Sequence, residues 1–182
     1  MKGLKGLVSV LLIGAMAFSI CACGSVKEIA GKDFKSIIKD TMDCDKSDLY
    51  EYEDSYYDYI ESEIYYGGED SNKYDISYTE YEDEEAAKYA FDRMVMNYEF
   101  YKKHGNIDGK VKIASNYIVI DAEVEYGYDA DKTDIYGGMY LAGNCIIDVT
   151  TGTGKDKDKD VIDEKIIEIN ITSPCFFINE IN

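Results

Sequence analysis

The chain has 182 residues, which suits one domain together with a short targeting segment. Lys and Arg number 19 against 37 Asp and Glu, and the formal net charge of −18 makes nucleic acid a poor partner because it repels phosphate backbones. The hydrophobic fraction of 46% is ordinary for a folded chain, and 18 Tyr with no Trp favour a high sheet content.

The first 22 residues have the proportions of a secretory signal peptide. Lys2 and Lys5 form a basic start, and residues 7–20 carry no charge. A transmembrane helix needs about 20 apolar residues, so this run is short for a membrane span. We therefore expect residues 1–22 to direct export and then to be removed.

The signal segment ends Ile20-Cys21-Ala22-Cys23, which resembles a bacterial lipobox. An aliphatic residue stands three positions before Cys23 and a small residue directly before it, whereas Ile in place of the commoner Leu and the second cysteine, Cys21, are departures from the pattern. The resemblance implies that Cys23 receives a diacylglyceryl group and begins the mature chain. Acyl chains of this kind would anchor the protein to the cell membrane, on its extracytoplasmic face. Ordinary secretion without a lipid is the alternative.

Three segments of the mature chain have helical periodicity. Residues 33–42 predict a first helix that Asp33 could cap, and residues 82–103 predict a longer one, with carboxylates at its start and basic residues at its end. A third helix is expected over residues 161–170, after a run of Lys and Asp. The apolar positions of the three are Phe34, Ile38 and Met42; Ala87, Phe91, Met94, Tyr98 and Tyr101; and Ile162, Ile166 and Ile169.

Alternation of apolar and polar residues predicts about five strands. Residues 50–66 and 74–79 alternate on either side of a turn at 67–72, which indicates a hairpin. Residues 118–126 predict another half-buried strand. Two further apolar runs flank Gly143-Asn144, a pair that suits a tight type II′ hairpin turn.

The resulting order is α-β-β-α-β-β-β-α, an α+β fold of about five mainly antiparallel strands and three helices, with the helices on one face of the sheet. We expect residues 23–32 to form a lipidated tether and residues 33–182 to form a single domain. The order, the Ser115-Asn116-Tyr117 step into a strand and the short last helix resemble small surface lipoproteins of gram-positive gut anaerobes. That resemblance implies a location and no activity.

Two acidic regions are candidate calcium sites. Residues 41–85 contain seventeen Asp or Glu, and Asp156, Asp158 and Asp160 imitate the start of an EF-hand loop. Calcium requires six or more oxygens converging on one point, and Val161 stands where such a loop needs glycine. We interpret the first region as a solvated face and the second as the approach to a helix, and we expect neither a metal nor a cofactor.

His104 is the only histidine, so a Ser-His-Asp triad or a Cys-His dyad could be built only around it. A hydrolase or thiol enzyme that uses His104 with Cys145 is the alternative to a non-catalytic domain, which we favour because no established catalytic motif occurs. Apart from Cys23, the mature chain has Cys44, Cys145 and Cys175. A Cys145–Cys175 or a Cys44–Cys175 disulfide is compatible with export, and Cys145 otherwise suits a core position.

Tyr57, Tyr59 and Tyr65 share one side of the predicted strand, opposite Ile60 and Ile64. If the isoleucines face the core, the three rings are exposed and could contact a ligand. The sequence therefore favours a surface-tethered domain that binds a protein, peptide or glycan through its sheet. An accessory lipoprotein without a small ligand is the third hypothesis.

Overall fold

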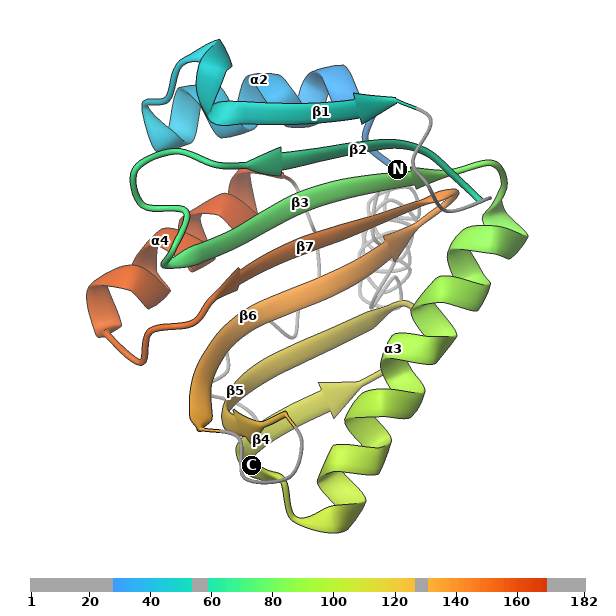
Figure 1. Cartoon of the computed structure of the whole chain (residues 1–182), viewed down its shortest axis with the longest axis vertical. Helices are drawn as coiled ribbons and strands as arrows, with labels where there is room; N and C mark the ends of the chain where they lie inside the picture. The colour runs from blue at the N-terminus through green and yellow to red at the C-terminus, as the bar shows by residue number, and fades with distance from the viewer. Residues whose placement is uncertain (1–27, 54–58, 127–130, 170–182) are drawn as a thin grey trace, which may run out of the picture.

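The structure, a computed structural model, describes residues 28–53, 59–126 and 131–169 (Figure 1). The predicted signal peptide and Cys23 lie outside these ranges. Within them, no helix is both long enough and apolar enough to cross a bilayer.

Seven strands form one antiparallel sheet in the order β1-β2-β3-β7-β6-β5-β4. The α+β class and the antiparallel sheet are confirmed, whereas the expected number of about five strands is too low. The strands are β1 (Leu49–Glu53), β2 (Ile60–Tyr66), β3 (Tyr74–Tyr81), β4 (Ile107–Ile113), β5 (Tyr117–Glu125), β6 (Lys132–Ala142) and β7 (Cys145–Thr151). The helices are α2 (Gly31–Met42), α3 (Glu84–His104) and α4 (Asp156–Glu168), with a short 3₁₀ turn η1 (Lys46–Asp48).

Two strands escaped the sequence analysis. The segment 50–66 was predicted as one strand, but it forms β1 and β2, which pair with each other so that Tyr52 lies opposite Glu63. Tyrosines and acidic residues recur on both sides of the reversal, and the only mark of it is the break in alternation at residues 54–57, which contain neither Gly nor Pro. β4 was missed because Gly109, at φ 141°, and two lysines interrupt its apolar pattern. β4 is an edge strand with β5 as its neighbour.

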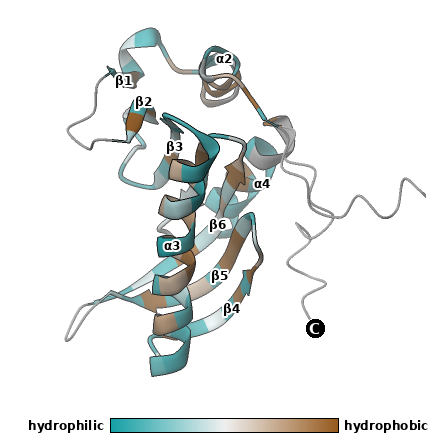
Figure 2. Cartoon of the chain, turned by 90° about the vertical axis from the view of Figure 1, so that its right-hand side faces the viewer, coloured by the Kyte–Doolittle hydropathy of each residue, from teal (hydrophilic) through white to brown (hydrophobic). Residues whose placement is uncertain are grey.

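The helices lie on both faces of the sheet, so the expectation that they share one face is wrong. α2 and α4 pack on one face and α3 on the other (Figure 2). Since strands alternate, each strand contributes to two separate cores. The core under α2 and α4 contains Phe34, Ile38, Ile64, Ile76, Tyr78, Tyr140, Cys145, Ile147, Val149 and Ile162 among others. The core under α3 contains Tyr81, Ala87, Phe91, Tyr98, Ile118, Ile120, Ala122, Val124 and Ile146.

The helix ends follow from local chemistry. Asp83 caps α3 by accepting a hydrogen bond from the backbone N–H of Ala86 at 2.8 Å, and Gly105 ends the helix at φ 76°. α2 begins at Gly31, two residues earlier than predicted, so Asp33 lies in its first turn and does not cap it. α4 begins at Asp156, which makes the Lys/Asp run part of the helix.

The β6–β7 hairpin turns at Gly143-Asn144 as predicted, with Gly143 at φ 61°. A second glycine, Gly137 in β6, holds a φ of 133°, and a Cβ there would collide with the β7 backbone and lie 3.1 Å from Ile162 of α4. Glycine at this position therefore allows β6 to adopt a positive φ in close contact with the β7 backbone.

Candidate functional site

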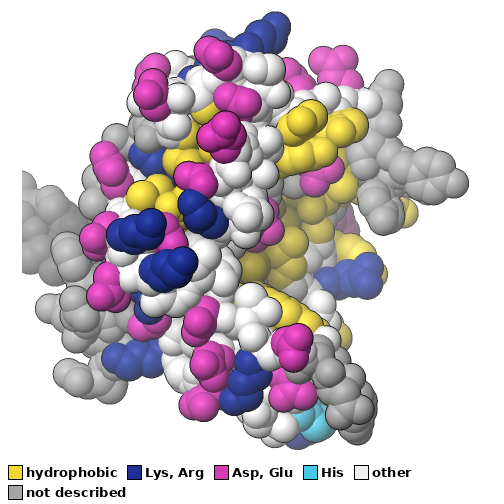
Figure 3. Space-filling view, turned by 60° about the vertical axis from the view of Figure 1, so that its left-hand side comes forward, with side chains coloured by type: hydrophobic (Ala, Val, Ile, Leu, Met, Phe, Trp, Pro, Cys, Tyr) yellow, Lys and Arg dark blue, Asp and Glu magenta, His cyan; other side chains and the backbone are white. Residues whose placement is uncertain are grey.

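One face of the sheet is only partly covered. α3 runs along one side of this face, from the end of β3 toward β4 and β5, and leaves much of β1, β2, β3 and β7 without a helix over them (Figure 1). In Figure 3, hydrophobic side chains gather in a hollow on this side of the molecule, with carboxylates at its margin. We call the uncovered surface the open face; its side chains are Tyr50, Tyr52, Glu63, Tyr65, Asp75, Ser77 and Asp148.

Three tyrosines stack at the β1–β2 end of the open face. The Tyr65 ring lies between the rings of Tyr50 and Tyr52, with centroid separations of 5.3 Å and 5.6 Å. The Tyr65 hydroxyl donates to the Tyr52 hydroxyl at 3.0 Å, and this hydrogen bond is the main reason that the pKa of Tyr65 rises to about 12. Tyr50 and Tyr52 remain 46% and 48% exposed, so the stack offers aromatic surface to a ligand.

Carboxylates lie beside this stack. A cleft of about 500 Å³ is lined in part by Glu63, Tyr65, Asp75 and Ser77. Ser77 is opposite Tyr65 on one side and opposite Asp148 on the other, so a small side chain separates a ring from a carboxyl group. Within the described ranges, no Lys or Arg forms an ion pair with Glu63, Asp75 or Asp148.

Asp148 occupies an unfavourable position for a charge. Part of the residue reaches solvent, but its Oδ1 is buried and has no hydrogen-bond partner among the described residues. Burial, and after it the charge of Asp75, raise the pKa of Asp148 well above its ordinary value, while a hydrogen bond from Thr150 opposes the rise. A buried carboxylate oxygen that lacks a hydrogen-bond partner costs free energy in the unliganded protein.

The charge of Asp148 also acts on two tyrosines, Tyr98 of α3 and Tyr126 after β5. The hydroxyls of Tyr98 and Tyr126 lie 3.1 Å apart. Burial raises the pKa of both tyrosines, and the charge of Asp148 raises each of them further. The open face thus joins aromatic rings at one end to hydroxyls at the other, with carboxylates between them.

The structure separates the tyrosines that the sequence analysis grouped. Tyr57 lies outside the described residues. Tyr65 belongs to the stack, whereas Tyr59 precedes β2 at its other end, is 58% exposed, and lines a different pocket together with Tyr89 of α3. Tyr65 stacks on Tyr50 of β1 instead of grouping with Tyr59. The sequence does not predict this contact as long as residues 50–66 are treated as a single strand.

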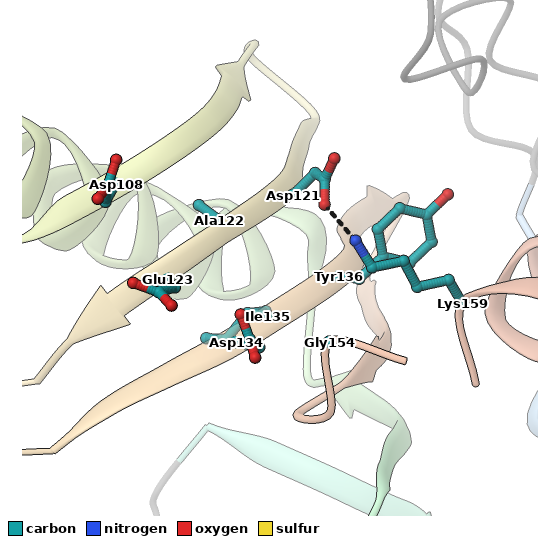
Figure 4. A pocket seen from close by; sticks show the side chains of 9 residues that line it. All are labelled: Asp108, Asp121, Ala122, Glu123, Asp134, Ile135, Tyr136, Gly154 and Lys159. Atoms are coloured by element: carbon teal, nitrogen blue, oxygen red, sulfur yellow. Dashed lines mark hydrogen bonds and ion pairs between the residues drawn. The ribbon is translucent and has the colours of Figure 1, made fainter. Parts of the chain in front are cut away.

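A second acidic depression lies on the other face of the sheet, between β4, β5, β6 and the start of α4 (Figure 4). It has a volume of about 200 Å³, and its only described cation, Lys159, is bound to Asp121 at 2.7 Å and lies over the Tyr136 ring. The carboxylates of Asp108 and Asp134 point away from one another in Figure 4. This depression is therefore a partly neutralised surface of α4 packing.

No three His, Cys, Asp or Glu side chains in the described part of the chain converge as metal ligands. Of the aspartates that imitate an EF-hand, Asp156 and Asp158 lie in the first turn of α4. Asp158 instead accepts hydrogen bonds from Tyr74 at 3.0 Å and from Thr153 at 2.5 Å. Its role here is to join α4 to β3.

The residues of the enzyme hypothesis are not brought together. His104 is exposed at the end of α3, where its ring stacks on Phe100 and its Nδ1 lies 2.8 Å from the Phe100 carbonyl oxygen. Cys145 is buried in the core on the opposite face, as predicted for a core residue. Cys44 and Cys145 are free thiols, and Cys175 lies outside the described residues.

The geometry of the open face is the main evidence on function, because similarity to known proteins provides no evidence. A comparison of the chain with protein-family models, with curated proteins and with solved structures finds no match.

Proposed function

We propose that this chain is a lipid-anchored protein of the extracytoplasmic face of a bacterial cell membrane, with a non-catalytic domain that binds a partner through the open face. The anchor rests on the lipobox resemblance at Cys23. The binding role rests on one observation, the stack of Tyr50, Tyr65 and Tyr52 on a part of the sheet that no described helix covers.

The stack is unusual for a surface that has no partner. Tyr50 and Tyr52 could have lain against a helix as the rings of β3 do, yet nearly half of each ring residue is open to solvent. Exposed aromatic surface that is rimmed by polar groups is typical of protein and ligand contact sites. Tyrosine suits such contacts because its ring packs on a partner while its hydroxyl makes directed hydrogen bonds.

The anchor is tested with two cysteine variants expressed in a gram-positive host that is fed an alkyne-bearing fatty acid. The wild type and Cys21→Ser should take up the label and give an intact mass that begins at a diacylated Cys23. Cys23→Ser should lose both the label and the membrane fraction. Labelling of Cys23→Ser, or an unmodified N-terminus in the wild type, contradicts the anchor.

The binding role is tested by photocrosslinking in intact cells, with a photoreactive phenylalanine at one position at a time. A probe at Tyr52 should give a discrete adduct that Tyr65→Ala abolishes, because Tyr65 supports the ring at that position. The control probe replaces Met96, which is 67% exposed on the outer side of α3. Equal adducts from both positions, or none from Tyr52, would sink the proposed contact surface.

A further inference from the structure

The unpaired carboxylates of the open face indicate the chemistry of its partner. We propose that the open face binds a basic peptide segment, with an Arg or Lys side chain lying over Ser77 between the Tyr65 ring and the carboxylates of Asp75 and Asp148. This inference rests on the proposed function, since it names the class of partner for the same surface.

The strand register places these groups around one point. Tyr65 and Asp148 are the direct neighbours of Ser77 on β2 and β7, and directly opposed residues in a sheet lie about 5 Å apart. Asp75 precedes Ser77 by two residues on the same face of β3. A cation above the small Ser77 side chain would therefore have Tyr65 on one side, Asp148 on the other and Asp75 next to it along β3.

The tyrosine rings and the carboxylates favour a cation for different reasons. Tyr50 and Tyr52 occupy the two faces of the Tyr65 ring, so a cation–π contact with an ammonium or guanidinium group is left to the exposed rings of Tyr50 and Tyr52, and Tyr65 offers the partner apolar contact along its edge. Carboxylates accept charge-assisted hydrogen bonds from the same groups, and Arg can engage them with two parallel donors. Asp148 Oδ1 lacks both solvent and a hydrogen-bond partner among the described residues, so a cation held at the exposed part of the same carboxyl group would lower the cost of its charge.

Charge complementarity favours a peptide over a smaller cation or a neutral ligand. The chain is strongly acidic, and Glu63, which lies opposite Thr79, adds a carboxylate to the same cleft on the side of Ser77 away from Asp75. The Tyr50 and Tyr52 rings continue the contact surface past the reach of a single cation. A neutral glycan could stack on these rings, but it would bring no charge to Asp75 and Asp148.

The test measures binding of two capped peptides to the full lipidated protein in nonionic detergent by isothermal titration calorimetry. The first is tetra-arginine, and the second is tetra-citrulline, which has nearly the same shape and no charge. We expect the arginine peptide to bind and the citrulline peptide to bind at least about tenfold more weakly. Equal binding of both peptides, or no binding of tetra-arginine, overturns the inference.

Variants distinguish a site from the general field of an acidic protein. Asp75→Asn/Asp148→Asn should weaken tetra-arginine binding at least about tenfold. The matched control is Asp40→Asn/Asp160→Asn, which removes the same number of carboxyl groups from exposed positions of α2 and α4 on the other face and should change binding less than about twofold. An equal loss in both double variants means that only the field attracts the peptide, which overturns the site.

The proposed binding surface and the proposed cationic partner can be refuted separately. If the Tyr52 crosslink forms in cells while tetra-arginine does not bind, the binding surface stands and its cationic partner is refuted. If the crosslink also fails, the proposed function falls with it. Circular dichroism of each variant excludes misfolding as the cause of a lost signal.

Discussion

Replacing Asp148 with Asn should make the unliganded protein more stable. The substitution keeps the size of the side chain and leaves one oxygen to accept the hydrogen bond from Thr150. It removes a charge whose Oδ1 has neither solvent nor a partner among the described residues. A residue that serves a ligand is often retained at such a cost, so a gain in stability at this position is expected of a binding site.

The size of the effect follows from linkage. The folded state raises the pKa of Asp148 above the ordinary 3.8, so between these two values the folded protein holds a proton that the unfolded chain has released. Wild-type stability therefore falls as the pH rises through this window, by about 1.4 kcal/mol for each pH unit that the window spans. The new amide also needs a partner, so we expect a net gain of about 1–3 kcal/mol above the window and almost none near pH 4.

The assay is urea unfolding of the wild type and Asp148→Asn at about pH 4 and about pH 8, followed by circular dichroism. The other carboxylates titrate in both proteins, so the difference between the two isolates Asp148. Asp121→Asn serves as a control, since it breaks the ion pair with Lys159 and should lower stability by about 0–1 kcal/mol at pH 8. A stability gap that is the same at both pH values, or an Asp148→Asn protein that is less stable at pH 8, would refute the reasoning.

Three further predictions concern the scaffold and are checked by the same unfolding measurement at neutral pH. Phe91→Ala should lower the free energy of unfolding by about 3–5 kcal/mol because Phe91 is fully buried on the sheet-facing side of α3. Phe100→Ala, at a position of the same helix that is 56% exposed, should lower it by less than about 1 kcal/mol. Similar losses in the two variants would contradict the placement of α3. Gly137→Ala should prevent stable folding because its Cβ would collide with the β7 backbone, while Gly105→Ala, with nothing within 4 Å, should lose only about 1–2 kcal/mol from its positive φ. A well-folded Gly137→Ala protein would disprove the close contact between Gly137 and β7. Asp83→Ala should cost about 1 kcal/mol through loss of the α3 cap, and no loss would mean that the cap is not formed in solution.

The sequence was most informative where one element carried several independent signals. α3 combines a 3.6-residue apolar period, a capping Asp83 and a terminating Gly105, and its predicted extent agrees with the structure to within two residues. The β6–β7 hairpin was similarly marked by Gly143. β4 had no such support, because an edge strand needs fewer apolar residues and tolerates Gly109.

The candidate site was harder to predict because it depends on which strands become neighbours. The sequence identified Tyr65 and the side of the strand that it occupies, but it could not bring Tyr50 next to Tyr65 without the β1–β2 reversal. Asp148 is separated from Ser77 by about seventy residues, and the β3–β7 pairing alone makes them neighbours. Periodicity also cannot assign a helix to one face of a sheet or the other, and the placement of α3 decides which part of the sheet stays open.

The early start of α2 limits how far the domain could stand from a bilayer. Only eight peptide steps separate Cys23 from Gly31, where the rigid helix begins. A fully extended residue spans at most about 3.5 Å, so a lipid at Cys23 would hold the beginning of α2 within about 28 Å of the headgroups. At that height, the domain would stand close enough to the bilayer to contact proteins that are embedded in the membrane.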